Sequence, residues 1–441
     1  MPSIEGPCGP TTYPCQLVDI DKLKPDPRNA RVHSKRQVLQ LVSCMDEFGF
    51  TNPILADEDW LIIAGHGRLL AAKERGFTEV PVIVISGLTE LQKRRLRLAD
   101  NKLGLNGAWD KDLLQLELKE LSVDIPDLDI PGFDVGEIDA IVLESPTAEY
   151  DVIPLVPAAA VSRKGDIWLL GRHRIACGDC RDEALLEALL KGRLVDAAFQ
   201  DSPFNVRVDG HVGGKGKVKH REFAFASGEM SPAEFVTFLR ETLGAGAKVS
   251  RNGAVHFLCM DHHHVDELIE ACRDIYGARL NICVWNKSNA GMGSLYRSKH
   301  ELIFVYRVGD AQHFNAVELG KHGRSRTNVW DGASVNTFGG SRPDDLKAHP
   351  TVKSHRLVAD AIMDVTRRGD AVLDSFLGSG TTVIACERTG RVGFGIEIDP
   401  LYVDVAIERF FLMTGEYAVL EETGEGFIEV RARRTAHDGA A

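Results

Sequence analysis

The segment Asp201-Ser-Pro-Phe204 holds the residue types needed to activate an amino group on a flat aromatic base. It directly follows the apolar run Val195–Phe199, which predicts a buried strand ending in a turn. Such an amino group is a weak nucleophile because its lone pair is delocalised into the ring, and acceptors for its two N–H groups would localise that pair. Asp201 and the backbone carbonyl of Ser202 could be these acceptors, Pro203 would stiffen the turn, and Phe204 would stack on the base. An ordinary Asp-Ser-Pro turn at a strand end is the alternative, and such turns are common.

A second segment, Asp374–Thr382, reads Asp-Ser-Phe-Leu-Gly-Ser-Gly-Thr-Thr and predicts a ligand cradle between a strand and a helix. Its glycines would let the backbone approach a ligand, and the helix N-terminus would offer free N–H groups. An acid at the end of the next strand, Glu397, could bind ribose hydroxyls. The third glycine of a dinucleotide fingerprint is missing, which favours S-adenosylmethionine over NAD. The predicted donor-binding residues of this region are Asp374, Phe376, Gly378, Ser379, Gly380, Thr381 and Glu397.

The composition is typical of a globular protein in a reducing compartment. The chain has 441 residues, enough for two or three domains, and 44% of them are apolar. No apolar run approaches the roughly 20 residues of a membrane span, and no secretory leader is visible at the N-terminus. The nine cysteines are scattered and odd in number, which argues against a disulfide scaffold. We therefore expect a cytoplasmic protein without a membrane partner.

A basic cluster lies directly after Phe204, although the chain as a whole carries a net charge of −12. Between residues 205 and 221, Asp209 is the only acid. A solvated loop is the alternative, but the position favours contact with nucleic-acid phosphates. The predicted DNA-binding residues are Arg207, Lys215, Lys217, Lys219 and Arg221.

The elements that would position these segments alternate between strands and helices from Gly165 onward. This alternation predicts an α/β fold with a doubly wound, mostly parallel sheet, whose ligands lie at the carboxyl ends of the strands. Strands are expected at residues 195–199, 254–259, 281–285, 301–306, 371–376 and 392–397, and helices begin near residues 231 and 261. The turn-rich range 312–349 does not fit the alternation.

The N-terminal part predicts a smaller α+β domain. A capping box at Ser34 and Gln37 opens a helix that Gly49 ends, and a basic amphipathic helix is expected over 88–103. Strands are expected at 53–56, 61–64 and 81–85, with a helix from Gly65 to about Gly76. The predicted organisation is a disordered tail over 1–15, a domain over 16–105, a helical and acidic linker over 106–160, a large domain over 161–425 and a tail over 426–441.

Four segments of the large domain resemble, in order, the motifs of the beta group of DNA amino methyltransferases. Asp201–Phe204 resembles D-P-P-Y, and Asp374–Thr382 resembles D-P-F-x-G-S-G-T-T. His349-Pro-Thr-Val-Lys353 resembles H-P-T-x-K-P, and Gly395–Tyr402 resembles G-I-E-x-D-x-x-Y. Gly178-Asp179 resembles the family's segment before the catalytic strand. The resemblance implies a Rossmann-like methyltransferase sheet and adds Asp179, His349 and Lys353 to the donor site.

Residues 16–105 resemble the ParB-like N-terminal domain through Asn29-Ala-Arg31, Gly49–Ile54 and Ala64–Arg68. In ParB proteins the phosphate-binding segment reads G-E-R-R, whereas this chain has Gly65-His-Gly-Arg68. This departure leaves nucleotide binding at this domain open. The whole chain resembles bacterial and phage proteins that join the two domains, some of them in restriction–modification.

The resemblance implies a site-specific methyltransferase that acts on the exocyclic amino group of adenine in double-stranded DNA, with S-adenosylmethionine as its cofactor. Adenine is expected over cytosine because Asp, rather than Ser, begins the catalytic motif. The alternatives are cytosine amino methylation, a ParB-like DNA-binding or partition factor with an inactive methylase half, and methylation of RNA or of protein glutamine. The recognition sequence, a restriction partner and the oligomeric state, a homodimer included, stay open.

No metal site is expected. Cys177-Gly-Asp-Cys180 has the spacing of metal ligands, but no second cysteine pair follows it. His262-His-His264 is expected to cap a helix or face outward from it. Pro14-Cys15-Gln16 matches a cytosine-carbon methylase motif but has no strand before it.

Overall fold

The computed structural model describes residues 12–125, 128–133, 135–143, 153–205, 228–287, 295–317, 326–332 and 353–438. The chain divides into two compact units. The N-terminal unit comprises Met1–Glu117 and Asp129–Asp134, and the C-terminal unit comprises Leu118–Leu128 and Val135–Ala441. Each unit is considered by itself below.

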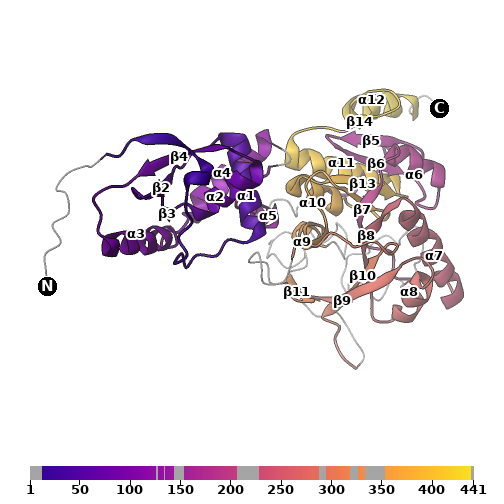
Figure 1. Cartoon of the computed structure of the whole chain (residues 1–441). Helices are drawn as coiled ribbons and strands as arrows, with labels where there is room; N and C mark the ends of the chain where they lie inside the picture. Colours follow the sequence, from indigo (N-terminus) through magenta and orange to yellow (C-terminus); the bar gives the residue numbers. More distant parts are fainter. Residues whose placement is uncertain are drawn as a thin grey trace. The chain divides into compact units, whose positions relative to one another are not determined.

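The N-terminal unit is a four-stranded sheet with helices, as the α+β prediction requires (Figure 1). Its strand order is β1-β4-β2-β3, in which only β2 and β4 run parallel. The strands are β1 Cys15–Asp19, β2 Ile54–Ala56, β3 Ile62–Ala64 and β4 Glu79–Val84, and the helices are Ile20–Lys22 (3-10), α1 Lys35–Phe48, α2 His66–Arg75 and α3 Glu90–Leu103. The core joins Ile54, Ile62 and Val82 of the sheet to Leu69 of α2.

Two expectations about the helices of this unit need correction. Only half of the expected capping box at Ser34 forms, because the Ser34 hydroxyl accepts from the Gln37 backbone N–H while the Gln37 side chain contacts His33. The predicted basic helix is confirmed as α3, but Lys93 and Arg97 are buried, where they pair with Asp57 and Asp26. These two cations therefore stabilise the unit and do not contribute to a basic surface.

The C-terminal unit contains a ten-stranded sheet of order β11-β9-β10-β8-β7-β12-β13-β6-β5-β14. The run β8-β7-β12-β13-β6 is parallel, but β10, β5 and β14 pair antiparallel with their neighbours, so the sheet is mixed. The strands are β5 Ile167–Leu170, β6 His173–Cys177, β7 Val195–Gln200, β8 Ser250–Met260, β9 Ala278–Lys287, β10 His300–Arg307, β11 Val329–Gly332, β12 Ala371–Asp374, β13 Val392–Glu397 and β14 Val419–Leu420.

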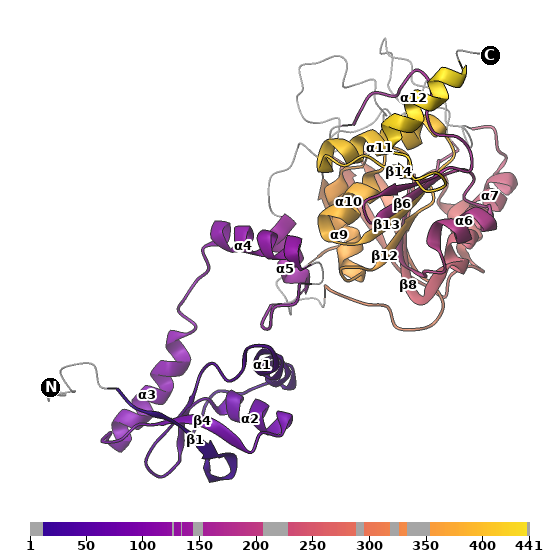
Figure 2. The same ribbon diagram turned by 90° about the horizontal axis from the view of Figure 1, so that it is seen from above.

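Helices cover both faces of this sheet (Figure 2). On one side lie α6 Glu183–Leu190, α7 Pro232–Lys248 and α8 Val265–Cys272, and on the other lie α9 His355–Val365, α10 Thr381–Thr389 and α11 Pro400–Thr414. Alternation along β8 explains this sandwich, since Phe257 packs among the α9 residues and Leu258 among those of α7. The predicted doubly wound α/β architecture is confirmed.

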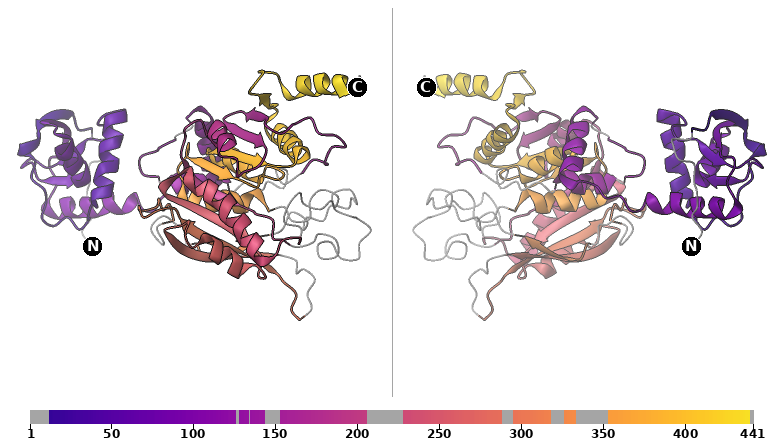
Figure 3. Two further views of the ribbon diagram at one scale, coloured as in Figure 1. Left: turned by 90° about the vertical axis from the view of Figure 1, so that its right-hand side faces the viewer. Right: turned by 90° about the vertical axis from the view of Figure 1, so that its left-hand side faces the viewer.

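Three helices lie in the ranges expected to be a partly helical linker and a tail. Within the connector, α4 Lys111–Asp124 is followed by α5 Val135–Leu143, and the α5 residue Asp139 contacts Arg391 at 2.6 Å and Arg368 at 2.9 Å. At the C-terminus, α12 Phe427–Asp438 lies near β14 and β5, and Phe427 is buried against Trp168 (Figures 1 and 3). The C-terminal unit thus includes α5 and α12.

Candidate active site

The two chemical segments meet at one edge of the large sheet. Strands β7 and β12 are parallel neighbours, so Asp201 and Asp374 both lie at their carboxyl ends. The side-chain oxygen of Gln200 accepts a hydrogen bond from the backbone N–H of Ser375 at 3.1 Å. Residues 175 positions apart in sequence are therefore joined directly beside the two acids.

Asp201 lies within reach of a ligand but is anchored on one side. One carboxylate oxygen, Oδ1, is 2.5 Å from the Nζ atom of Lys353, whose side chain is only 3% exposed, while the Asp201 side chain keeps 31% exposure. Ser202 is buried, and the Phe204 ring packs against the core with its centroid 5.9 Å from Lys353 Nζ. Oδ2 of Asp201 and the partly exposed Phe204 ring are therefore the groups that a base could contact.

Lys353 belongs to a chain of alternating charges. Its Nζ atom is 3.0 Å from Glu301 at the start of β10, and Glu301 is 2.6 Å from Lys287 at the end of β9. Both lysines also lie 5 to 6 Å from the Trp285 ring centroid. Each buried charge thus has an opposite neighbour, which offsets part of the cost of removing it from water.

The pKa directions in this chain follow from burial and pairing. Burial raises the pKa of Asp201 above its usual range, and the positive charge of Lys353 limits that rise. Burial would also raise the pKa of Glu301, but Lys353 and Lys287 hold it below its ordinary value. Burial opposes the charged form of Lys353, yet the acids around it keep its pKa well above that of a free lysine. A cation is therefore maintained permanently behind Asp201.

The segment after β12 has the geometry of a ligand cradle. Gly378 adopts φ +53°, and a Cβ atom added there would meet only the Phe376 carbonyl oxygen, at 3.9 Å, so this backbone borders open space. Gly380, at φ +83°, instead packs closely on α11, because a Cβ atom there would lie 2.9 Å from Ala406. Gly378 therefore borders open space, whereas Gly380 allows the start of α10 to pack closely on α11.

Two acids accept hydrogen bonds from residues of this segment. Asp374 accepts hydrogen bonds from the Thr382 hydroxyl at 2.6 Å and the Phe376 backbone N–H at 3.0 Å, and burial raises its pKa to about 7. Glu397, at the end of β13, accepts from the N–H of Gly378 at 2.8 Å, and burial raises its pKa to about 7 as well.

Three other predicted donor residues have protein partners. The Arg409 guanidinium donates to the Ser379 and Thr381 hydroxyls at 3.2 and 2.9 Å. Asp179 follows the end of β6 and forms an ion pair with Arg181 at 2.7 Å. The preceding backbone N–H, at Gly178, donates to the Glu397 carbonyl, so Asp179 lies at the same edge as the cradle.

Several predicted residues lie outside the described part of the chain. These are His349 and the basic residues Arg207, Lys215, Lys217, Lys219 and Arg221. The residues on either side of the basic segment are described, however. The Asn205 side chain accepts from the N–H groups of Gly228 and Met230, at 3.1 and 3.2 Å, and donates to the Met230 carbonyl. The segment therefore leaves and rejoins the sheet at one place, next to Phe204.

The residues weighed as metal ligands have other roles. Burial raises the pKa of both Cys177 and Cys180 to about 12, so these thiols stay protonated near neutral pH. Asp261 accepts from the backbone N–H groups of His263 and His264, and α8 begins only at Val265, later than expected. Within the described ranges, no group of three or more His, Cys, Asp or Glu side chains is arranged to hold a metal ion.

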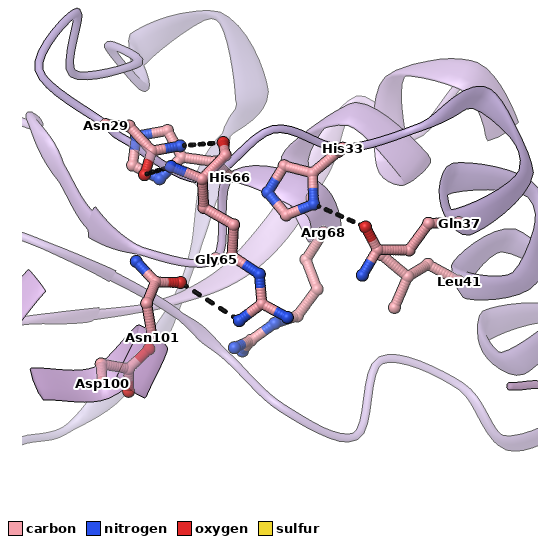
Figure 4. Close-up of a pocket in the computed structure, with 11 residues that line it drawn as sticks. Asn29, His33, Gln37, Leu41, Gly65, His66, Arg68, Asp100 and Asn101 are labelled. Atoms are coloured by element: carbon pink, nitrogen blue, oxygen red, sulfur yellow. Dashed lines mark hydrogen bonds between the residues drawn. The ribbon is translucent and has the colours of Figure 1, made fainter. Parts of the chain in front are cut away.

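The N-terminal unit has a separate polar pocket of about 160 Å³ around Gly65–Arg68 (Figure 4). Arg68 donates to the carbonyls of Asn52 and Pro53 at 2.7 and 2.5 Å, and His66 accepts from the Asp26 backbone N–H at 3.2 Å. Burial lowers the pKa of His66, which keeps its ring neutral. These contacts give the segment a structural role in its own unit.

The site therefore combines a partly exposed carboxylate, a buried cation behind it and a glycine-containing turn that is bonded to the acid Glu397. Such a set can hold a nucleoside-like ligand and an amine side by side. Glu301, Lys287 and Trp285 were missed from the sequence, because they come from strands β9 and β10 and match no short motif. The signal that could have found them is an acid at the start of an otherwise apolar strand.

Comparison with known proteins gives three family matches. The DNA methylase family matches residues 195–408, the ParB N-terminal domain family matches residues 11–102, and the ParB-methyltransferase HTH domain family matches residues 112–164. The last of these covers most of the range expected to be a linker.

Individual proteins resemble different parts of the chain. The ParB-like nuclease domain-containing protein YnaK of Escherichia coli (strain K12) is 54% identical over 76 residues, which span 17% of this chain and 87% of YnaK. Type II methyltransferase M.Cfr9I of Citrobacter freundii is 35% identical over 136 residues, 29% of this chain and 42% of M.Cfr9I. The chain therefore spans less than half the length of that methyltransferase. The structure of PvuII DNA methyltransferase (cytosine-N4-specific) is similar at 15% identity and a TM-score of 0.43, covering 62% of this chain and 93% of that one.

Proposed function

Because this chain belongs to the proteins that join a ParB N-terminal domain to a DNA methylase domain, we propose that it methylates the exocyclic amino group of adenine in DNA. The observation that carries the proposal is the meeting of Asp201 with the Gly378 cradle at one sheet edge. S-adenosylmethionine is the methyl donor, and its sulfonium group supplies an activated methyl. The proposed substrate places the enzyme in the cytoplasm.

The residues of the cradle suit this donor. Gly378 borders open space, Phe376 two residues before it is half-buried, and Glu397 would accept the ribose hydroxyls. The side chains of Ser379 and Thr381 act through Arg409, which fixes the turn at the start of α10. Asp179 and its partner Arg181 would border the adenosine end of the donor, next to Glu397.

Asp201 activates the acceptor amine. Its free oxygen Oδ2 and the carbonyl of Ser202 accept the two N–H groups, which localises the nitrogen lone pair towards the methyl carbon. The nitrogen–carbon bond forms as the carbon–sulfur bond breaks, and the methylated nitrogen then releases one proton to Asp201 or to water. No covalent enzyme intermediate is involved, so catalysis depends on orientation and on acceptor placement.

Asp201→Ala in the full chain tests this role. With tritiated S-adenosylmethionine and unmethylated plasmid DNA, we expect turnover to fall by about 100-fold or more, since both acceptance and orientation are lost. Donor affinity, measured by calorimetry, should stay within about twofold, because Asp201 lies outside the cradle. Asp261→Ala is a matched control, since Asp261 follows β8 as Asp201 follows β7. Full methyl transfer by Asp201→Ala would refute the assignment.

Analysis of the methylated product identifies which base is the target. Adenine is proposed because Asp rather than Ser begins the catalytic segment, and N4-methylation of cytosine is the second candidate. Mass spectrometry of nucleosides from methylated plasmid should show N6-methyladenine. N4-methylcytosine would select the second candidate, and no methylated nucleoside would favour a DNA-binding factor with an inactive methylase half.

A further inference from the structure

The connection between β9 and β10 leaves the sheet at the edge that holds Asp201. Strand β8 runs parallel to β7 and ends at Met260, where it pairs with the beginning of β10 through Leu302. The antiparallel partner β9 ends at Lys287, so both ends of this hairpin lie at the same edge. The described end of the connection extends beyond the sheet (Figures 1 and 3).

A series of ion pairs connects the base of the hairpin to Asp201, the proposed catalytic residue. The Lys287 backbone N–H donates to the Lys299 carbonyl at 2.8 Å, and the Lys287 side chain lies 2.6 Å from Glu301. Glu301 contacts Lys353, which contacts Asp201. A chain of ion pairs, buried at Glu301 and Lys353, therefore connects the start of the hairpin to Asp201.

The described part of the connection between β9 and β10, residues 295–299, has an unusual surface. Leu295 and Tyr296 are 83% and 84% exposed, the highest values among the large apolar side chains of the C-terminal unit's described residues. The sequence from Lys287 to His300 contains Arg297 and Lys299 and no acid, in a chain whose net charge is −12. Apolar and cationic groups together, without acids, complement the bases and phosphates of a nucleic acid.

We propose that residues 295–299 contact duplex DNA beside the target base, with Leu295 and Tyr296 against the bases and Arg297 and Lys299 near the phosphates. The inference rests on the proposed function and adds a DNA-contacting element to it. A base can reach Asp201 only after it leaves the stack, and its departure exposes the faces of its neighbours. Apolar and aromatic side chains placed there replace the lost stacking, as they do where proteins insert side chains between base steps.

The double variant Leu295→Ala/Tyr296→Ala tests this role in the full chain. The methylation site is first mapped by sequencing plasmid DNA methylated by the wild type. Turnover is then measured on a duplex oligonucleotide with that site, and on the same duplex with an abasic position opposite the target base. We expect the variant to lose about 10-fold or more on the paired duplex, from the stacking contribution of one base. On the abasic duplex, where extrusion is easier, activity should return to within about twofold of the wild type.

A matched control removes an exposed apolar side chain at the other end of the sheet. Leu194, 55% exposed, precedes the start of β7, so Leu194→Ala should leave both activities unchanged. Unchanged activity of the double variant on the paired duplex would refute the inference, and so would an equal loss on both duplexes. Thermal melting of the variant separates misfolding from either result, and Tyr296→Phe should retain most activity if stacking is the role. A wild type that methylates no DNA would instead refute the proposed function.

Discussion

At the scale of single residues, Lys353 is the side chain whose role the sequence and the structure describe differently. The resemblance to a methylase motif placed it in the donor site, but its ammonium group contacts Asp201 and Glu301. We infer that Lys353 is a positioning residue, which holds one oxygen of Asp201 and keeps that carboxylate ionised inside the protein.

Lys353→Met tests this inference through the pH dependence of turnover. Burial raises the pKa of Asp201 and Lys353 lowers it, so loss of the cation should raise that pKa further. Turnover requires the ionised carboxylate, and the acidic limb of the pH–rate profile should therefore move to higher pH. Donor affinity should change little.

Lys287→Met is the comparison, because Lys287 touches Glu301 and not Asp201, so its shift should be smaller. An unchanged pH profile combined with a tenfold or larger loss of donor affinity would return Lys353 to the donor site.

The chemical residues could be predicted to the extent that they follow strands within one short segment. Asp201, Asp374, Gly378 and Glu397 each follow or end an apolar run, and the topology of a doubly wound sheet then brings them to one edge. Glu301 could not be predicted in this way, because its role depends on ion pairs with Lys287 and Lys353, which lie in other segments of the chain. Short motifs record the order of residues along the chain and not such contacts.

At the scale of elements, α3 shows that a helix with a basic sequence can place cationic side chains in the protein interior. Lys93 Nζ lies 2.9 Å from Asp57, and both side chains are almost inaccessible to solvent. Burial would raise the pKa of Asp57, but hydrogen bonds from Lys93, Leu61 and Asp59 lower it. Asp57 is therefore ionised at neutral pH and depends on this partner.

Lys93→Met should destabilise the N-terminal unit by about 3 kcal/mol at pH 7, because it leaves a buried carboxylate without its cation. Hydrogen exchange followed by mass spectrometry should show about 100-fold less protection in β3 and α3. Arg94→Met, on the exposed side of the same helix, should change neither. Because the folded pKa of Asp57 is depressed, the stabilisation exists above its ordinary value of 3.8 and disappears as the pH falls below it. Equal protection of the Lys93→Met variant and the wild type at pH 7 would contradict this account.

The sequence missed the helix α12 and the direction of β10, although it predicted a strand at residues 301–306. α12 is rich in arginine and inserts Phe427 and Val430, three residues apart, into the core, which is too little to distinguish it from a polar tail. The antiparallel strand β10 reads like any buried strand, because its direction depends on its neighbours and not on its composition. The parallel centre of the sheet was predictable because each strand there is followed by a helix.

At the scale of the whole molecule, the two units have separate cores and should unfold separately. We expect calorimetry of the full chain to resolve two transitions. S-adenosylmethionine should raise the midpoint of one transition only, since a ligand stabilises the unit that binds it. Lys93→Met should lower only the other, and NAD at the same concentration should change neither. A single transition that responds to both changes would show that the units unfold together.

The pair of contacts made by Asn205 has a consequence for how such an enzyme could acquire new specificity. Its backbone takes up a left-handed conformation, at φ +53°, and its amide ties residue 205 to residues 228 and 230. The described residues that flank the intervening 22 positions are thereby held together at one place beside Phe204. Natural variation or protein engineering could therefore replace residues 206–227 while Asp201 and Phe204 keep their positions.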